Sequence, residues 1–198
     1  TPGYNTNPVG ADTQIEFVLA KVDPNGNPTN GINRVNLCQD SWSTNDINSI
    51  VKPATIWDPT LYMNMWSVNF TDSTLLGYAQ FPSSSGLAGL NASGGAANTD
   101  GVVANYTTFG SRLLVPSGNY AGTQYDEGRT MTHEVGHFLG LRHLWGDGDC
   151  TASDYCNDTP SCDADYYSGE GTGGCTSPTQ CTEPRQTENY MDYSDDSC

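Results

Sequence analysis

One stretch, residues 133 to 143, contains every histidine of the 198-residue chain and constrains its fold more than any other feature. It reads His-Glu-Val-Gly-His-Phe-Leu-Gly-Leu-Arg-His. His133 and His137 are four positions apart, so on a helix their imidazoles project from one face, one turn apart. Gly140 favours a left-handed backbone that ends the helix and turns the chain, which brings His143 back toward the other two. The stretch predicts a helix, a glycine turn and three converging imidazoles.

Three neutral imidazoles are typical of a catalytic zinc site, because the fourth tetrahedral position stays open for water. A bare H-E-x-x-H pattern often arises by chance, but the glycine and the third histidine at fixed offsets make coincidence improbable. Glu134 lies beside the ligands and is placed to take a proton from zinc-bound water and to pass it to a leaving amine. The motif therefore predicts hydrolysis of peptide bonds with Zn²⁺ as the cofactor.

Net charge and hydropathy limit the partners and the amount of regular structure. The chain has 23 acidic and 7 basic residues, a formal net charge of -16, and no basic cluster. We therefore expect neither nucleic acid nor a membrane as a partner. The mean hydropathy is -0.52, and 22 Gly and 11 Pro indicate many turns. The length suits a single catalytic domain, residues 1–198, with an upper subdomain at 1–143 and a lower one at 144–198.

Apolar runs between turn residues predict four strands, at residues 14–22, 61–70, 75–81 and 101–108. We expect the second of them to be central. A short helix is predicted after Ser43 or Thr44 and should stop before Pro53, and Asp126 should cap the zinc-motif helix. This order predicts an α+β fold, with a twisted mixed sheet and the zinc helix above a cleft and a small irregular part below it.

Cysteine usage predicts a secreted protein. Six of the seven cysteines lie between positions 150 and 198, and no C-x-x-C pair occurs. Because zinc already has histidine ligands, we interpret these cysteines as disulfide partners in an oxidising, extracellular compartment. Cys38 is distant in sequence and is predicted to be a buried free thiol, with a different pairing as the alternative.

A second motif, Asn189-Tyr190-Met191-Asp192-Tyr193-Ser194, follows the zinc motif, with Cys198 soon after it. A long zinc motif followed by a methionine in a tight turn resembles the metzincin clan of zinc metallopeptidases, and these residues resemble its pappalysin family, of the ulilysin-like type. Weaker similarity covers most of residues 56–198. The resemblance implies a metzincin-like fold and a zinc metalloendopeptidase that is made as an inactive zymogen. Its partners would be protein or peptide substrates, and we expect a monomer.

The resemblance also implies roles for single residues. Zinc would be bound by His133, His137 and His143, and Glu134 would be the general base. Met191, in the Met-turn, would form the hydrophobic floor under the metal. Tyr193 would stabilise the oxyanion of the tetrahedral intermediate, although a tyrosine in such a turn can also serve packing alone.

Two further groups are predicted to bind substrate. The stretch Gly77, Tyr78 and Ala79 resembles the edge strand at the upper rim of the family's cleft, where an extended substrate would be added as a strand. The alternative is an exposed edge without a role. Asp195 and Asp196 lie close to the Met-turn and predict a preference for a basic residue at P1′, directly after the scissile bond.

Residues 147 to 160 are dense in oxygen ligands, which suits Ca²⁺. The resemblance points to a structural calcium held by Asp154 and Thr159 and by backbone carbonyls of residues such as Ser153 and Asn157. The alternative is an acidic, solvated loop. Family pairing implies the disulfides Cys150–Cys181 and Cys175–Cys198, which leaves Cys156 and Cys162 as an extra local pair.

Two other functions remain open. The first is a zinc-containing peptide-binding or adhesion module without turnover, although a binder has no need of the carboxylate of Glu134. The second is a zinc hydrolase that acts on a small amide and does not cleave unfolded protein chains.

Overall fold

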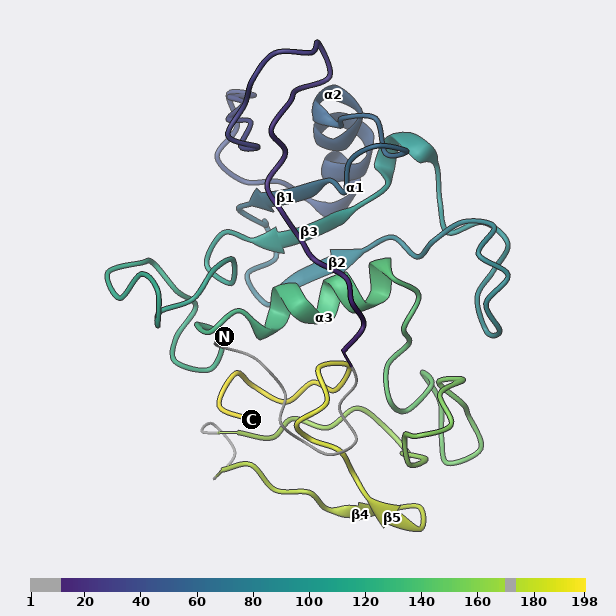
Figure 1. Cartoon of the computed structure of the whole chain (residues 1–198). Helices are drawn as coiled ribbons and strands as arrows, with labels where there is room; N and C mark the ends of the chain where they lie inside the picture. The colour runs from purple at the N-terminus through teal and green to yellow at the C-terminus, as the bar shows by residue number, and fades with distance from the viewer. Residues whose placement is uncertain (1–11, 170–173) are drawn as a thin grey trace. The chain divides into compact units, whose positions relative to one another are not determined.

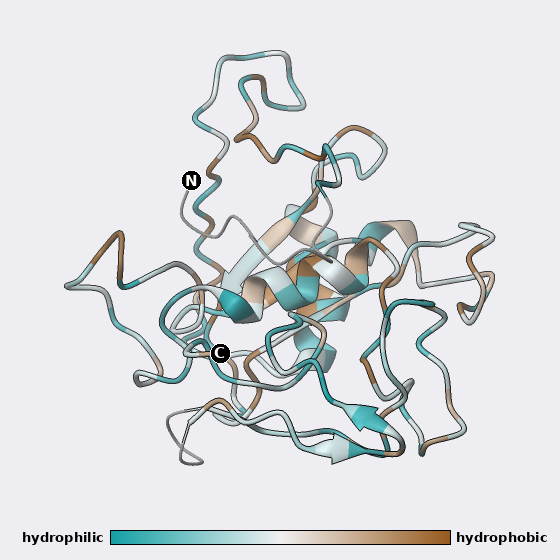
Figure 2. Cartoon of the chain, turned by 60° about the horizontal axis from the view of Figure 1, so that its bottom comes forward, coloured by the Kyte–Doolittle hydropathy of each residue, from teal (hydrophilic) through white to brown (hydrophobic). Residues whose placement is uncertain are grey.

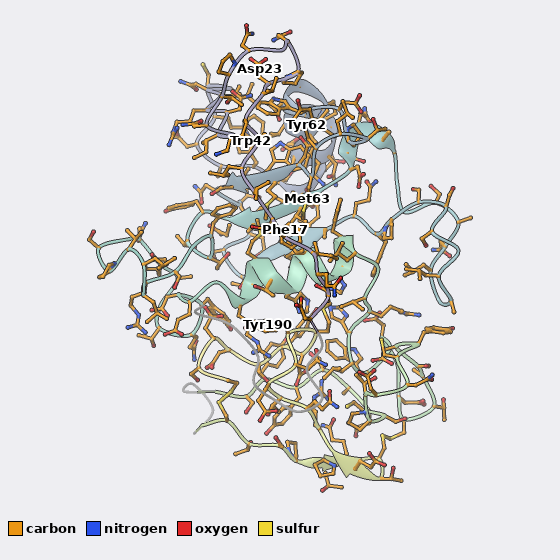
Figure 3. All side chains as sticks on the ribbon, in the orientation of Figure 1. Phe17, Asp23, Trp42, Tyr62, Met63 and Tyr190 are labelled. Atoms are coloured by element: carbon orange, nitrogen blue, oxygen red, sulfur yellow. A yellow bond between two sulfur atoms is a disulfide. The ribbon has the colours of Figure 1, made fainter. Side chains whose placement is uncertain are left out.

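The computed structural model describes residues 12–169 and 174–198, and the chain divides into two compact units, Thr1–Val35 and Asn36–Cys198. In the first unit, Asp23 closes a turn by accepting the backbone N–H of Asn25 and of Asn27 at 2.9 and 2.8 Å (Figure 3). The predicted strand at 14–22 is wrong. Its only pairing among the described residues is the isolated bridge Val22–Pro28, and alternation without a neighbouring strand does not make a sheet.

A three-stranded mixed sheet is the framework of the second unit. Its strands are β1 (Met65–Val68), β2 (Gly77–Ala79) and β3 (Val102–Asn105), in the order β1-β3-β2 (Figure 1). β1 runs parallel to β3 and β2 runs antiparallel to it. The mixed sheet is confirmed, and β1 lies within the strand predicted at residues 61–70. The central strand is β3, so the expectation that the strand at 61–70 would be central is wrong. All four residues of β3 are buried, as expected for a strand covered on both faces.

The helical segment above the sheet consists of α1 (Thr44–Asp46), η1 (Ile47–Val51) and α2 (Lys52–Thr55). Ser43 Oγ accepts the backbone N–H of Asp46 at 3.1 Å, so the predicted start is confirmed. The predicted stop before Pro53 is wrong, because the helical segment continues through Pro53 to Thr55, and Pro53 stands at the start of α2, where proline is tolerated. The segment contributes to a core made of Trp42, Ile47, Val51, Phe70 and Val103.

Helix α3 (Arg129–Phe138) carries the zinc motif and packs against β2 and β3 (Figure 1). Its N-cap is Gly128, with φ 98°, and not Asp126. The carboxylate of Asp126 instead pairs with Arg112 Nε at 2.5 Å. The helix start is held from the other end of the chain, because Asp196 Oδ2 accepts the backbone N–H of Gly128 at 3.0 Å and that of Glu127.

Most of the described residues after α3 lie in turns, and the strands found among them are the short β4 (Thr179–Gln180) and β5 (Glu183–Pro184). A 3-10 turn, η2 (Ala97–Thr99), precedes β3. All four residues of strands β4 and β5 lie on the hydrophilic side of the hydropathy scale (Figure 2). Disulfides Cys150–Cys181 and Cys175–Cys198 crosslink this region. Among the described residues, no helix is long and apolar enough to cross a membrane.

Three cysteines are free thiols, which corrects two expectations. Cys156 and Cys162 do not pair. Cys162 is buried and its thiol points to Pro160 O at 3.4 Å, while that of Cys156 lies 3.9 Å from Asp154 O. Cys38 is exposed and not buried. The division into subdomains at residue 143 stays a prediction.

Candidate metal centre and cleft

The three imidazoles meet at one point in the structure. His133 and His137 project from the same face of α3, and His143 returns after the turn at Gly140, where φ is 100°. His137 Nε2 lies 3.1 Å from Nε2 of His133 and 3.1 Å from Nε2 of His143. The geometry expected from the histidine spacing and the glycine turn is therefore present.

Each imidazole is oriented by an oxygen at its other nitrogen. The Nδ1 atoms of His133 and His137 lie 2.7 and 2.8 Å from the backbone carbonyls of Tyr190 and Leu141. Figure 3 labels Tyr190 just below α3. His143 Nδ1 lies 2.6 Å from a carboxylate oxygen of Asp147. With Nδ1 as the donor in each contact, all three Nε2 atoms present lone pairs to the common point.

These donors fit zinc. Two nitrogens at tetrahedral corners around zinc, each about 2.05 Å from the metal, are about 3.3 Å apart, close to the 3.1 Å found here. Burial, together with the neighbouring imidazoles, lowers the pKa of His133 to about 3, and burial lowers that of His137 to about 4. Both side chains are therefore neutral near pH 7, the form that binds a metal. Among the described residues, only this cluster gathers three or more such ligand groups.

Glu134 lies beside the imidazoles, between α3 and the sheet. Its side chain is buried, and burial raises the pKa of its carboxyl to about 8. A Cβ built on Gly77 would lie 2.9 Å from Glu134 Cγ and 3.0 Å from its Oε1, so β2 passes directly over this carboxyl. Only glycine at position 77 allows this approach. The acid/base candidate and the rim strand are thus in direct contact.

Met191 and Tyr193 approach the imidazoles from below. Met191 is buried, and a Cβ built on Gly136 of α3 would lie 2.3 Å from its Sδ atom. The ring of Tyr193 lies 4.9 Å from that of His143, centroid to centroid. Burial and nearby acidic groups raise the pKa of Tyr193 to about 12, so its phenol keeps its proton and remains a hydrogen-bond donor. The structure therefore brings both residues of the second motif to the first.

A cleft of about 700 Å³ contains this centre. Its walls include the three histidines and Glu134, all three residues of β2, and Tyr193 and Asp196. Asp195 does not line the cleft. Its carboxylate Oδ1 accepts the backbone N–H and the hydroxyl of Ser197 at 3.0 and 2.5 Å. Of the two acids predicted to bind substrate, the structure places Asp196 alone at the cleft.

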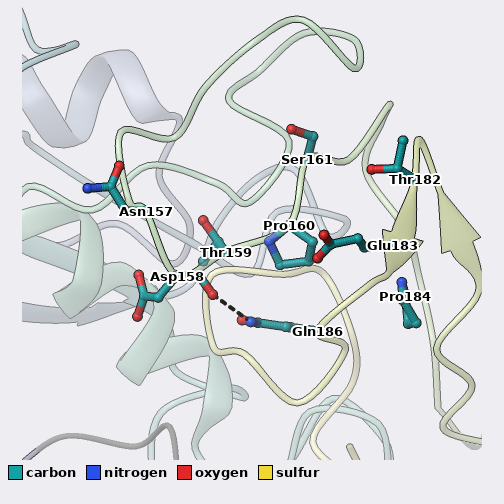
Figure 4. A pocket seen from close by; sticks show the side chains of 9 residues that line it. All are labelled: Asn157, Asp158, Thr159, Pro160, Ser161, Thr182, Glu183, Pro184 and Gln186. Carbon is teal, nitrogen blue, oxygen red and sulfur yellow. Dashed lines mark hydrogen bonds between the residues drawn. The ribbon is translucent and has the colours of Figure 1, made fainter.

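The residues predicted to hold calcium lie together around a buried carboxylate. Asp154 is 9% exposed, and its two oxygens accept the N–H of Cys156 at 3.0 Å and the hydroxyl of Thr159 at 2.5 Å. No ion pair to Asp154 is present in the described part of the chain. Asn157 and Thr159 also line a smaller hollow of about 350 Å³ beside β5, closed by the hydrogen bond from Gln186 Nε2 to Asp158 O at 2.9 Å (Figure 4).

Sequence reasoning missed several residues that build this centre. Arg129, the first residue of α3, donates to the carbonyls of Thr187 and Asn189 at 2.9 and 2.6 Å and so ties the second motif to the helix. Arg185 forms a fully buried ion pair with Asp192 at 2.5 Å. Arg129 lies in the stretch Gly128-Arg129-Thr130, which weakly resembles the family, and Arg185 lies in neither of the two motifs. The role of each arginine is seen only from the distant partners that the fold supplies.

The mixed sheet, the zinc-motif helix and the methionine beneath it define the class of protein: the fold and the centre are those of a metzincin. More narrowly, the chain belongs to the M43 peptidase family, whose model, described as pregnancy-associated plasma protein-A, matches residues 45–198. The family expected from the two motifs is therefore confirmed.

Individual relatives agree. An extracellular metalloprotease of Verticillium alfalfae is 41% identical over 150 residues, which are 75% of this chain and 46% of that protein. One of Arthroderma gypseum is 37% identical over 144 residues, 69% of this chain and 42% of that protein. Mature mirolysin of Tannerella forsythia, in complex with a cleaved peptide, superposes with a TM-score of 0.73 at 37% identity, over 92% of this chain and 64% of that one. The chain thus spans less than half the length of these two fungal relatives.

Proposed function

We propose that this chain is the catalytic part of a secreted zinc metalloendopeptidase that hydrolyses peptide bonds in proteins. The observation that carries the proposal is the convergence of three imidazole Nε2 atoms beside the buried carboxyl of Glu134, inside a cleft that an edge strand borders. Zinc in such a site polarises the substrate carbonyl and lowers the pKa of water to about 7.

The chain's own residues would carry out the remaining steps. The carboxylate of Glu134 takes the proton of the attacking water and gives it to the leaving amine. The phenol of Tyr193 donates a hydrogen bond to the oxygen that becomes negatively charged. β2 pairs with β3 along one side only, so its outer backbone groups are available to bind an extended substrate as an added strand. Met191 supports α3 from below at Gly136.

Asp196 supports a preference for a basic residue at P1′. Its Oδ2 accepts two backbone N–H groups at the start of α3, while its Oδ1 is buried at the cleft and has no hydrogen-bond partner among the described residues. A guanidinium or ammonium group of a substrate would form a hydrogen bond with that oxygen.

We expect Asp196→Asn to reduce the ratio of kcat/KM for Arg over Leu at P1′ by at least about tenfold, since hydrogen bonds to charged groups contribute about 1.5–3 kcal/mol. Asp195→Asn is the matched control, and an unchanged ratio in Asp196→Asn would contradict the assignment.

Three observations support secretion and a precursor. The relatives are named extracellular metalloproteases, and two disulfides are typical of an oxidising compartment. A promirolysin mutant also resembles this chain, with a TM-score of 0.72 at 35% identity, over 92% of this chain and 56% of that one. We therefore expect an inactive precursor here too.

A structural calcium ion at Asp154 is part of the same proposal. A buried carboxylate without an ion pair, next to the hydroxyl of Thr159 and the carbonyls of its loop, suits a hard cation with oxygen ligands. A calcium-selective chelator, added with zinc in excess, should lower the melting temperature of the protein. An unchanged melting temperature would remove calcium from the proposal.

Incubation with casein tests the function directly. Fragments should form with the zinc-loaded protein, disappear with a chelator and return when zinc is added back. If casein binds without being cut, the protein is a binding module. If casein stays intact while a small amide is hydrolysed, the protein is a small-amide hydrolase.

A further inference from the structure

Of the three histidines, only His143 lies outside α3. The other two are held by the helix backbone, and their Nδ1 atoms meet backbone carbonyls. His143 follows the turn at Gly140 and lies on a loop, so its imidazole needs other contacts to hold its orientation. Since a metal site loses affinity when a ligand must be ordered on binding, these contacts bear directly on zinc affinity.

We propose that Asp147 is a positioning residue that holds His143 in the tautomer and orientation needed for zinc. This inference rests on the proposed function for its biological role, but the quantity that it predicts is the affinity for zinc, which is measured without any cleavage. Asp147 Oδ1 lies 2.6 Å from His143 Nδ1, a short contact in the direction expected of a charge-assisted hydrogen bond. A carboxylate at this place keeps the proton on Nδ1 and leaves Nε2 free for the metal.

The loop is shaped to return Asp147 to the histidine. Gly146 and Asp147 both have left-handed backbones, with φ of 58° and 60°. Glycine adopts this conformation freely, and aspartate tolerates it better than most residues do. The N–H groups of Gly146 and Gly148 close two turns by donating to the carbonyls of His143 and Trp145, at 2.9 and 3.1 Å. Two consecutive turns thus bring the carboxylate back to the imidazole four residues earlier.

The second carboxylate oxygen is held separately. Asp147 Oδ2 lies 3.2 Å from an Arg142 guanidinium nitrogen, which also donates to Gly146 O at 3.1 Å. Arg142 donates as well to Gly89 O at 3.3 Å, on the loop that follows β2. The guanidinium therefore ties Asp147 to the loop that follows β2, and Oδ1 remains for the histidine.

The face of the His143 ring is fixed by a stack. The ring of Trp145 lies parallel to it, with 4.3 Å between centroids and 3° between planes. The guanidinium of the buried Arg185 lies 5.5 Å from the Trp145 ring. Trp145 limits tilting of the imidazole, but a ring stack does not select the tautomer. The carboxylate of Asp147 at Nδ1 selects it.

Zinc affinity, measured by competition with a chromogenic chelator, tests the proposal on the full chain without any assay of cleavage. Asp147→Asn removes the charge and keeps the size, and Asn tolerates the left-handed backbone. Asp147→Gly removes the side chain without backbone strain. Both variants should raise the zinc Kd by about 10- to 100-fold, the usual effect of losing a partner of a metal ligand, and both should shift the absorption bands of the cobalt-substituted protein.

Asp149→Asn is the matched control. It lies two residues away, and its carboxylate accepts only from Thr151 in its own turn, so its zinc Kd should stay within about twofold of the original. The melting temperature without metal reports on folding of every variant. A Kd and a cobalt spectrum unchanged in Asp147→Asn would overturn the proposal, as would an equal loss in Asp149→Asn. Because the zinc Kd is measured without substrate, the two hypotheses can fail separately. If the variants show the expected zinc Kd values but the protein cleaves no substrate, only the proposed function is contradicted.

Discussion

The carboxyl of Glu134 combines deep burial with direct contact to the rim strand at Gly77. Its raised pKa of about 8 describes the carboxyl in a site without a cation. A divalent metal beside it favours the ionised form, which is the form that a general base needs. In the proposed mechanism, a metal ion beside this buried carboxyl would therefore make Glu134 an effective base near neutral pH.

Glu134→Gln should abolish most of the activity and leave the metal in place. The amide has nearly the shape of the carboxyl but cannot accept the water proton, so we expect kcat to fall by at least about 10²-fold, the lower end for general acid–base catalysis. Zinc content by elemental analysis should match that of the original protein. Turnover close to the original by a zinc-loaded variant would exclude this role.

Lys52 predicts a pH dependence of stability. It is 1% exposed, donates to Thr99 O at 3.0 Å, and burial lowers its pKa to about 8. In the unfolded chain the lysine pKa is about 10.4. Between these values the unfolded chain binds a proton that the folded one lacks, so the contribution of Lys52 to the free energy of unfolding rises with pH through this window.

The measurement compares the original protein with Lys52→Met by denaturant unfolding at pH 7.5, 9 and 10. The difference in unfolding free energy should move in favour of the lysine as pH rises, by about 3 kcal/mol at most, at 1.36 kcal/mol for each pKa unit. Tyrosines that ionise in this range are common to both proteins and cancel. A difference that stays constant from pH 7.5 to 10 would contradict the prediction.

At the scale of elements, β2 and α3 pack directly against each other. β2 is the edge strand of the sheet, and Gly77 allows it to lie against Glu134 on α3. The same strand carries Tyr78, whose ring lies 4.7 Å from Lys52 Nζ and 6.1 Å from the ring of Phe70. Strand β2 is thus anchored in the upper core on one side and touches the carboxyl of Glu134 on the other.

Gly77→Ala tests this contact. A methyl group there would lie 2.9 Å from the backbone carbonyl of Val103 and from Glu134 Cγ, so strand or helix must shift. We expect a loss of about 1–3 kcal/mol in the free energy of unfolding, typical of overpacking, and a lower kcat. Gly26→Ala is a control for the loss of a glycine, since its Cβ would meet nothing within 4 Å, although its φ of 84° adds strain of its own. Unchanged stability and kcat in Gly77→Ala would show that the contact is looser than the structure indicates.

At the scale of the whole molecule, the region after α3 depends on crosslinks and polar contacts. Its buried hydrophobic cluster consists of Leu144, Trp145 and Cys162, with Tyr193 packed against it. The ion pair of Arg185 and Asp192, with no side-chain exposure, lies close by. So small an apolar cluster stabilises little by itself, and the disulfides restrict the unfolded chain instead.

Cys150–Cys181 and Cys175–Cys198 span sequence separations of 31 and 23 residues. Loop entropy predicts about 3–4 kcal/mol of stabilisation from each. Replacing either pair by Ser should therefore lower the melting temperature strongly and weaken zinc binding, because Tyr190 and Asp147 belong to the crosslinked region. Cys156→Ser is the control, since Cys156 is a free thiol. Melting temperatures that match the control would show that the crosslinks are dispensable.

Local rules of the chain explain the predictions that the structure confirmed. Helical spacing placed His133 and His137 on one face, the glycine turn returned His143, and Ser43 capped its helix. Apolar runs marked the three strands of the sheet, of which β3 is buried along its whole length. Each of these features depends on residues a few positions apart, so the sequence by itself was enough to predict the three converging imidazoles and the class of fold, while the role of Glu134 as general base stays a proposal.

Tertiary structure alone decided the features that depend on distant partners. Strand order made β3 central, residues 14–22 gained only the isolated bridge Val22–Pro28 among the described residues, and the carboxylate of Asp126 paired with Arg112 while Gly128 became the N-cap of α3. Asp196 took over contacts at the helix start from a position nearly 70 residues away. The contact of Asp147 with His143 is local in sequence, but it too depends on the folded backbone, through two left-handed residues in one loop. A polar side chain forms a hydrogen bond with a partner that the folded backbone brings within about 3 Å. Composition and residue spacing do not predict which distant residue that partner is.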